Sequence, residues 1–129
     1  MQAVVFDLDD TLICGDTGKV PKQTFHLLRK LQRAGIKMGI ISANPMAVMF
    51  AQVHRLAKYI PFALSQGPKE TRAHLFGRAL DKLGVEPDNV LYCDDGARNL
   101  ASVAEQFPRI TTLLCEDVQQ LHTLFEDIS

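Results

Sequence analysis

The chain has few of the residues on which secreted and membrane-spanning proteins depend. It contains three cysteines, Cys14, Cys93 and Cys115, and no tryptophan. An odd number of cysteines without C-x-x-C spacing favours neither a disulfide framework nor a metal site, so we expect a reducing, cytoplasmic compartment, and nuclear access stays open. The first residues lack a basic segment followed by a long apolar one, and no apolar run is long enough to cross a bilayer. We therefore expect neither a signal peptide nor a membrane segment.

The chain also lacks an excess of charge. Its formal net charge is −1, which gives no global attraction to nucleic acid or to anionic lipid. The densest basic group, Arg29, Lys30 and Arg33, falls where a helix is expected to end, and a favourable contact with the helix dipole explains it. We expect no nucleic-acid partner and no membrane partner. The length of 129 residues fits one domain, residues 1–129.

Strand-like and helical segments alternate along the chain. We expect strands at residues 3–6, 36–41, 61–65, 89–93 and 109–115. We expect helices at about 21–34, 45–58, 69–83 and 97–107, and a last one holding Val118, Leu121, Leu124 and Phe125. In the second helix we expect core positions at Met46, Val48, Met49, Phe50 and Val53. Short connections between strand and helix predict an α/β fold with a parallel sheet covered by helices on both faces.

Polar residues follow several of these strands directly. Asp7 and Asp9 come after the first strand, Ser42 after the second, and Asp94 with Asp95 after the fourth. Lys69 follows the third strand, at the expected start of a helix. Because the carboxyl ends of parallel strands share one edge of a sheet, we expect these groups to lie together.

The chemistry that suits this set is phosphoryl transfer. Carboxylates this close repel one another, and Mg²⁺, which prefers oxygen ligands, would offset their charge. Asp7 could act as a nucleophile, and Asp9 could protonate the leaving oxygen and then activate water. Lys69, Ser42 and backbone N–H groups could hold the phosphate oxygens. Taken singly, Asp7 and Asp9 could instead cap a turn, Ser42 could cap a helix, and Lys69 could be solvated.

The motifs resemble those of the haloacid dehalogenase (HAD) superfamily. Residues 5–12, VFDLDDTL, look like its first motif, and Ser42, Lys69 and residues 93–95 are similar to the second, third and fourth. The resemblance implies a Rossmann-like three-layer sandwich with strand order 5-4-1-2-3 and an aspartyl-phosphate intermediate on Asp7. It implies Asp7, Asp9 and Lys69 as catalytic residues and Ser42, Ala43 and Lys69 as phosphate-binding residues. It implies Mg²⁺ bound by Asp7, the Asp9 carbonyl and Asp94, with Asp95 nearby, directly or through water.

Within the superfamily, residues 92–99 and Gly67-Pro68-Lys69 resemble the magnesium-dependent phosphatases, which act on phosphotyrosine and sugar phosphates. The chain departs from that group at Asp10, Ile13, Ala43 and Asn44, and this leaves the substrate open between macromolecular and small phosphate esters. The connections between Asp9 and Ser42, and between Ser42 and Lys69, are filled by the expected elements. We therefore expect no cap domain and an open site, covered locally by residues 13–20.

Other interpretations remain open. A phosphoacceptor signalling domain of the receiver type uses a similar set of groups, but it needs an aspartate at the end of the third strand, where Ser65 stands. A phosphatase acting on nucleic-acid ends would need a basic groove, which the sequence does not provide. A non-catalytic Mg²⁺-binding protein would not need every motif residue. Repeated turnover of para-nitrophenyl phosphate would separate the enzyme from the signalling domain.

Overall fold

The computed structural model describes residues 1–116 and 118–124. Its strands are β1 (Ala3–Phe6), β2 (Lys37–Ser42), β3 (Ala63–Ser65), β4 (Val90–Asp94) and β5 (Thr111–Leu114). Its helices are α1 (Lys22–Arg33), α2 (Ala47–Val53), α3 (Arg72–Leu83), α4 (Ala97–Gln106) and α5 (Val118–Leu124), with short 3₁₀ turns at Leu56–Lys58 and Pro87–Asn89. All neighbouring strands are parallel, in the order β3-β2-β1-β4-β5, which confirms the predicted α/β fold and strand order.

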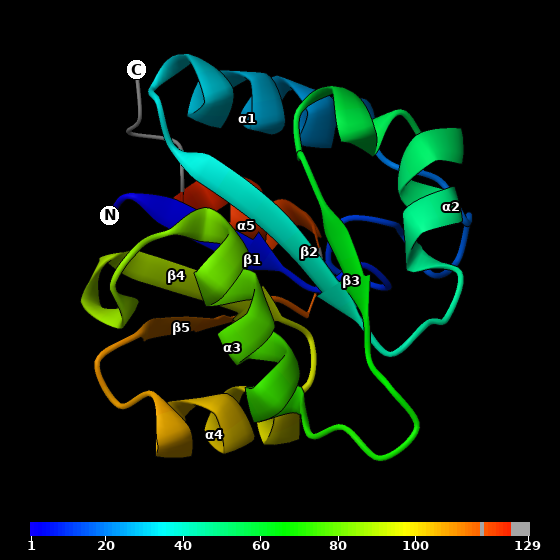
Figure 1. Cartoon of the computed structure of the whole chain (residues 1–129). Coiled ribbons are helices and arrows are strands. Elements are labelled where there is room, and N and C mark those ends of the chain that lie inside the picture. Colours follow the sequence, from blue (N-terminus) through cyan, green and yellow to red (C-terminus); the bar gives the residue numbers. More distant parts are fainter. Residues whose placement is uncertain (117, 125–129) are drawn as a thin grey trace.

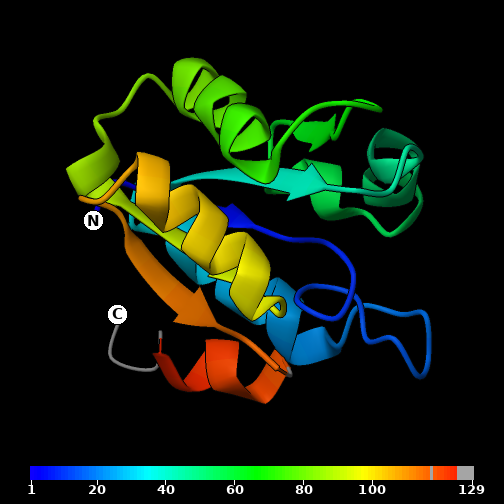
Figure 2. The ribbon, with the colours of Figure 1, turned by 90° about the horizontal axis from the view of Figure 1, so that it is seen from below.

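The sheet is the middle of three layers, with α1 and α5 on one face and α3 and α4 on the other (Figures 1 and 2). Successive side chains of β1 point to opposite faces of the sheet. Val4 and Phe6 belong to the core beneath α1 and α5, whereas Ala3 and Val5 belong to the core beneath α3 and α4. A strand buried on both faces can therefore be apolar throughout, as residues 3–6 are.

Phe62 and Gly39 show how tightly the edge of the sheet is packed. The ring of Phe62 lies where a side chain at position 39 would begin, because a Cβ built on Gly39 would be 2.3 Å from that ring. Only glycine allows this approach. Phe62 directly precedes β3, whose Ala63 pairs with Ile40 of β2.

The predicted helix over residues 45–58 is wrong in length and in burial. α2 ends at Val53, and Arg55 takes a left-handed conformation (φ 62°) before the 3₁₀ turn Leu56–Lys58. Four side chains expected in the core are largely exposed: Met46, Val48, Met49 and Val53. Two small residues, Ala47 and Ala51, form the buried side of α2 instead. The helix lies beside β3 at the end of the sheet, where the core needs only a thin cover (Figure 1).

Two other expectations concern helix ends. α3 begins at Arg72, with Thr71 as its N-cap, so Lys69 lies in the turn before the helix rather than at its start. The last helix is present as α5, but Phe125 lies outside the described residues. No helix in the described ranges is both long and apolar enough to span a membrane.

Candidate active site

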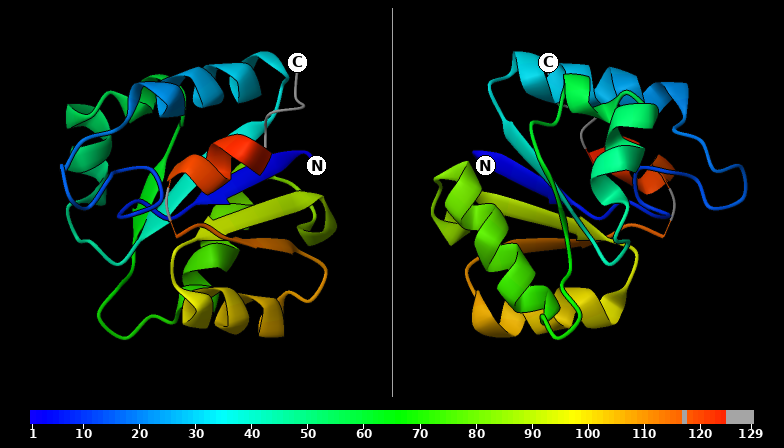
Figure 3. Two further views of the ribbon diagram at one scale, coloured as in Figure 1. Left: turned by 180° about the vertical axis from the view of Figure 1, so that it is seen from behind. Right: turned by 45° about the vertical axis from the view of Figure 1, so that its right-hand side comes forward.

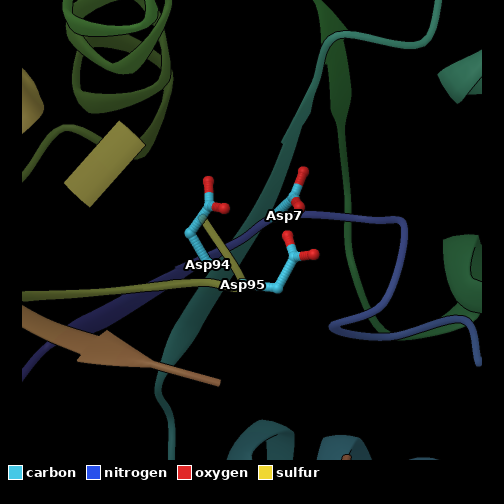
Figure 4. A group of neighbouring side chains, drawn as sticks. All are labelled: Asp7, Asp94 and Asp95. Atoms are coloured by element: carbon cyan, nitrogen blue, oxygen red, sulfur yellow. The ribbon is translucent and has the colours of Figure 1, made fainter. Parts of the chain in front are cut away.

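Three carboxylates meet where β1 and β4 end. Phe6 pairs with Cys93, so the next residues, Asp7 and Asp94, lie side by side, and the Asp7 N–H donates to the Cys93 carbonyl at 2.9 Å. Asp95 follows Asp94, and one oxygen of each of the three side chains lies within 4.8 Å of the others. Figure 4 shows these side chains gathered at the edge of the sheet. The predicted convergence of strand ends therefore occurs for Asp7, Asp94 and Asp95.

Asp94 is the most firmly held of the three. Its side chain is fully buried. One oxygen, Oδ1, accepts a hydrogen bond from the Gly96 N–H at 2.8 Å, and Oδ2 accepts one from the Tyr92 hydroxyl. The Asn99 amide lies 3.3 Å from Oδ2. These bonds fix the direction in which the carboxylate points.

Burial and the Asp94 charge disfavour ionisation of Asp7. They raise the pKa of Asp7 from 3.8 to about 9, although Arg72 acts in the opposite direction. Burial also raises the pKa of Asp95. Crowded carboxylates of this kind must share protons or bind a cation. The set fits Mg²⁺, which takes oxygen ligands, and Asp7, Asp94 and Asp95 could hold it. The expected contribution of the Asp9 carbonyl stays a prediction.

Arg72 is the cation that contacts these acids, and sequence analysis missed it. Its Nη1 lies 3.8 Å from Asp7 Oδ1 and 4.0 Å from Asp94 Oδ2, and its side chain is 8% exposed. Its buried Nε has no hydrogen-bond acceptor among the described residues. A signal was present in the sequence: an arginine in the first turn of a helix opposes the helix dipole and needs another reason to be there.

Lys69 was predicted to supply this charge. It lies in an exposed turn, three residues before Arg72, and no contact between Lys69 and the carboxylates is found in the described part of the chain. Its approach to a bound phosphate stays a prediction.

The end of β2 and the loop after it provide the expected polar groups. Ser42 is buried, and its Oγ accepts a hydrogen bond from the Asn44 N–H at 3.0 Å. Asn44 in turn caps the following turn, because its Oδ1 accepts from the Met46 N–H at 2.9 Å. Ala43, between them, is exposed. The Ser42 hydroxyl and the Ala43 N–H therefore lie at the same edge of the sheet as the carboxylates.

Asp9 and the following loop form the outer side of the site. Asp9 is exposed and forms an isolated bridge with Ile13. A second bridge, between Cys14 and Lys19, folds residues 13–20 into a small hairpin, which we call the hairpin loop. It projects beyond the carboxyl edge of the sheet (Figure 3). An exposed carboxylate on this side is accessible to a leaving group and to water.

The first part of the chain matches a known protein family. Residues 4–67 match the family model of haloacid dehalogenase-like hydrolases, a range that includes Asp7, Asp9, Ser42 and Ala43. No curated protein sequence matches the chain significantly.

Several solved structures share the fold. The N-terminal part of a Bacteroides fragilis protein, containing a phosphatase domain complexed with Mg, is 19% identical, with a TM-score of 0.74, over 98% of this chain and 40% of that one. A haloacid dehalogenase-like family protein from Streptococcus pneumoniae is 12% identical, with a TM-score of 0.74, over 95% and 90% of the two chains. CbbY from Rhodobacter sphaeroides, in complex with phosphate, is 11% identical, with a TM-score of 0.67, over 87% and 84%. The chain thus spans two fifths of the first of these.

Proposed function

The chain belongs to the haloacid dehalogenase-like hydrolases, and on this premise we propose that it is a Mg²⁺-dependent phosphatase that forms an aspartyl-phosphate on Asp7. The observation that carries the proposal is the cluster of Asp7, Asp94 and Asp95 beside Arg72. Carboxylates and a buried guanidinium together suit a phosphate group whose charge must be offset on several sides.

In the first step Asp7 attacks phosphorus, the bond from phosphorus to the ester oxygen breaks, and Asp9 gives that oxygen a proton. In the second step Asp9 takes a proton from water, the water oxygen attacks phosphorus, and the Asp7 carboxylate is released. Mg²⁺, when bound, neutralises the acidic cluster and the phosphate oxygens, so that Asp7 can react as the anion.

Arg72, Ser42 and Ala43 would hold the phosphate. The free Nε of Arg72 is a buried donor that a phosphate oxygen could satisfy. The Ser42 hydroxyl and the Ala43 N–H would bind the remaining oxygens. Lys69, in the exposed turn before α3, would contact the phosphate or the outer part of the substrate.

The substrate proposal follows from what surrounds the site. Within the described residues no connection at this edge contains a further domain that could act as a cap. Met46, Met49 and Val53, spaced three and four residues apart, expose 46%, 45% and 67% of their surface on one side of α2. An apolar surface beside an open site favours phosphate on a bulky or aromatic carrier, such as a phosphotyrosine protein, over a small sugar phosphate.

Two experiments test this function. Purified protein should turn over para-nitrophenyl phosphate many times with Mg²⁺ and should stop when the metal is chelated, and Asp7→Asn should remove nearly all of this activity. A single turnover, or an Asp7→Asn variant as active as the wild type, would exclude the proposal.

The carrier is tested by comparing kcat/KM for aromatic phosphopeptides and for sugar phosphates. Met49→Ser with Val53→Ser should weaken only the former. Val48→Ser, on another side of the same helix, is the matched control. A sugar phosphate preferred over every peptide would contradict the carrier proposal and leave the chemistry intact.

A further inference from the structure

The segment between β3 and α3, residues 66–71, is fixed by one carboxylate, that of Glu70. Its Oε1 accepts hydrogen bonds from the Gly67 N–H at 2.9 Å and from Arg78 Nη2 at 2.6 Å. Its Oε2 accepts from Arg78 Nε at 2.8 Å, which makes the pairing with Arg78 bidentate. The Glu70 side chain is only 10% exposed. The bonds from Arg78, above all, lower the pKa of Glu70 from 4.5 to about 2, so the pair stays charged at any pH at which the protein would work.

The same pair links α3 to the phosphate-binding side of the site. Arg78, in the middle of α3, also donates from Nη2 to the Ser65 carbonyl at 3.1 Å, at the end of β3. The neighbouring Gln66 N–H donates to the Ser42 carbonyl at 2.8 Å, and the Gln66 side chain donates to the Glu70 carbonyl at 2.7 Å. Through Glu70, Gln66 and Arg78, the start of α3 is therefore attached to the end of β2, where Ser42 lies.

Arg72 lies next to this attachment. It is the first residue of α3, two residues after Glu70, and its guanidinium lies 3.8–4.0 Å from the two acids it faces. At these distances the ion pairs are loose, and its bond to the Ile41 carbonyl is 3.5 Å long. A small shift of the helix start would move the guanidinium away from Asp7 and Asp94.

We propose that Glu70 and Arg78 are positioning residues that set the start of α3 and thereby hold Arg72 at the site. Neither residue is placed to touch the substrate: both act through Arg72. The effect on phosphate binding rests on the proposed function, whereas the effect on the place of Arg72 does not.

The direct test is the Arg72 Nε–H signal in proton–nitrogen NMR spectra of Mg²⁺-free and Mg²⁺-loaded protein. A buried guanidinium exchanges slowly enough with water to give a separate peak, which Arg72→Lys should remove and so assign. Glu70→Gln and Arg78→Gln should each shift or broaden this peak. Lys82→Gln, on an exposed position of the same helix, is the matched control and should leave it in place.

The functional readout is inhibition by inorganic phosphate. Glu70→Gln and Arg78→Gln should raise the inhibition constant about tenfold, with Arg78→Lys, which keeps one charged donor, in between. If either Gln variant fails to fold, Glu70→Asp and Arg78→Lys take its place, with a smaller displacement of the same peak expected. Folded variants whose Arg72 peak and phosphate affinity both match the wild type would overturn the proposal. If the wild type neither hydrolyses nor binds phosphate, the proposed function fails, and the Arg72 peak alone then decides whether Glu70 and Arg78 position it.

Discussion

The Nη1 atom of Arg72 lies 3.8 Å from Oδ1 of Asp7, and about nine-tenths of each side chain is buried. Asp94, whose Oδ2 lies 4.0 Å from the same Nη1, brings a second carboxylate, so one guanidinium faces two acids. A buried arginine shared in this way binds neither acid tightly and keeps donors free for a third anion. This is the arrangement that a phosphate ester would complete.

Arg72, rather than Lys69, should therefore carry most of the cationic stabilisation. We expect Arg72→Gln to lower kcat/KM with para-nitrophenyl phosphate about 10²-fold. Arg72→Lys should cause a smaller loss, because an ammonium keeps the positive charge but cannot pair with two acids as a guanidinium does. Lys69→Gln should have the smaller effect. Steady-state kinetics on folded variants measure this, and a larger loss for Lys69→Gln would restore that residue to the central role.

The contribution of Asp9 to the rate of hydrolysis should increase with the basicity of the leaving group, because a more basic leaving group needs a proton more. Asp9→Asn should slow the hydrolysis of alkyl phosphates more than that of activated aryl phosphates. A plot of log kcat against leaving-group pKa should be steeper for the variant than for the wild type. Parallel lines would show that Asp9 is not the general acid.

The raised pKa of Asp7 predicts a pH dependence of stability in metal-free protein. Between the ordinary pKa of 3.8 and the raised pKa of about 9, Asp7 keeps its proton in the folded protein but loses it in the unfolded chain. The stability that this group contributes is therefore complete below this pH range and is lost as the pH rises through it. Asp7→Asn cannot lose a proton, and its melting temperature relative to the wild type should rise from about pH 5 to about pH 8 with chelator present. Mg²⁺ should raise the wild-type melting temperature more at the higher pH. A constant difference between the two proteins would show that Asp7 ionises normally.

The hairpin loop should affect substrate choice more than chemistry. A Cβ at Gly15 would be 2.1 Å from Asp10 Oδ1, and Gly18 has φ +67°, so Gly15→Ala with Gly18→Ala must reshape the loop. We expect KM and substrate preference to change while kcat for an activated ester stays within a few-fold. Gly35→Ala, with φ +76° and no neighbour within 4 Å, is the control for backbone strain alone. Equal effects of the two changes would exclude a role for the loop.

The sequence predicts the sheet and part of the site because both follow from local patterns. Apolar runs that end in Asp7 and in Asp94 identify two strands and the edge at which they meet. The exposure of Met49 and Val53 could not be read from the same pattern, since periodicity does not reveal that Ala47 and Ala51 suffice to cover β3. Arg72 was missed because its partners, Asp7 and Asp94, are far from it in sequence and only the folded sheet brings them within 4.0 Å of its guanidinium.

The central claim, that Asp7 becomes phosphorylated, is tested most directly by trapping. Protein quenched with acid during turnover of para-nitrophenyl phosphate and then reduced with borohydride should contain homoserine at position 7, detected by mass spectrometry of the N-terminal peptide. Protein quenched without substrate should retain aspartate there. Reduction at Asp94 or Asp95 instead, or an unmodified Asp7 while phosphate accumulates, would contradict the account.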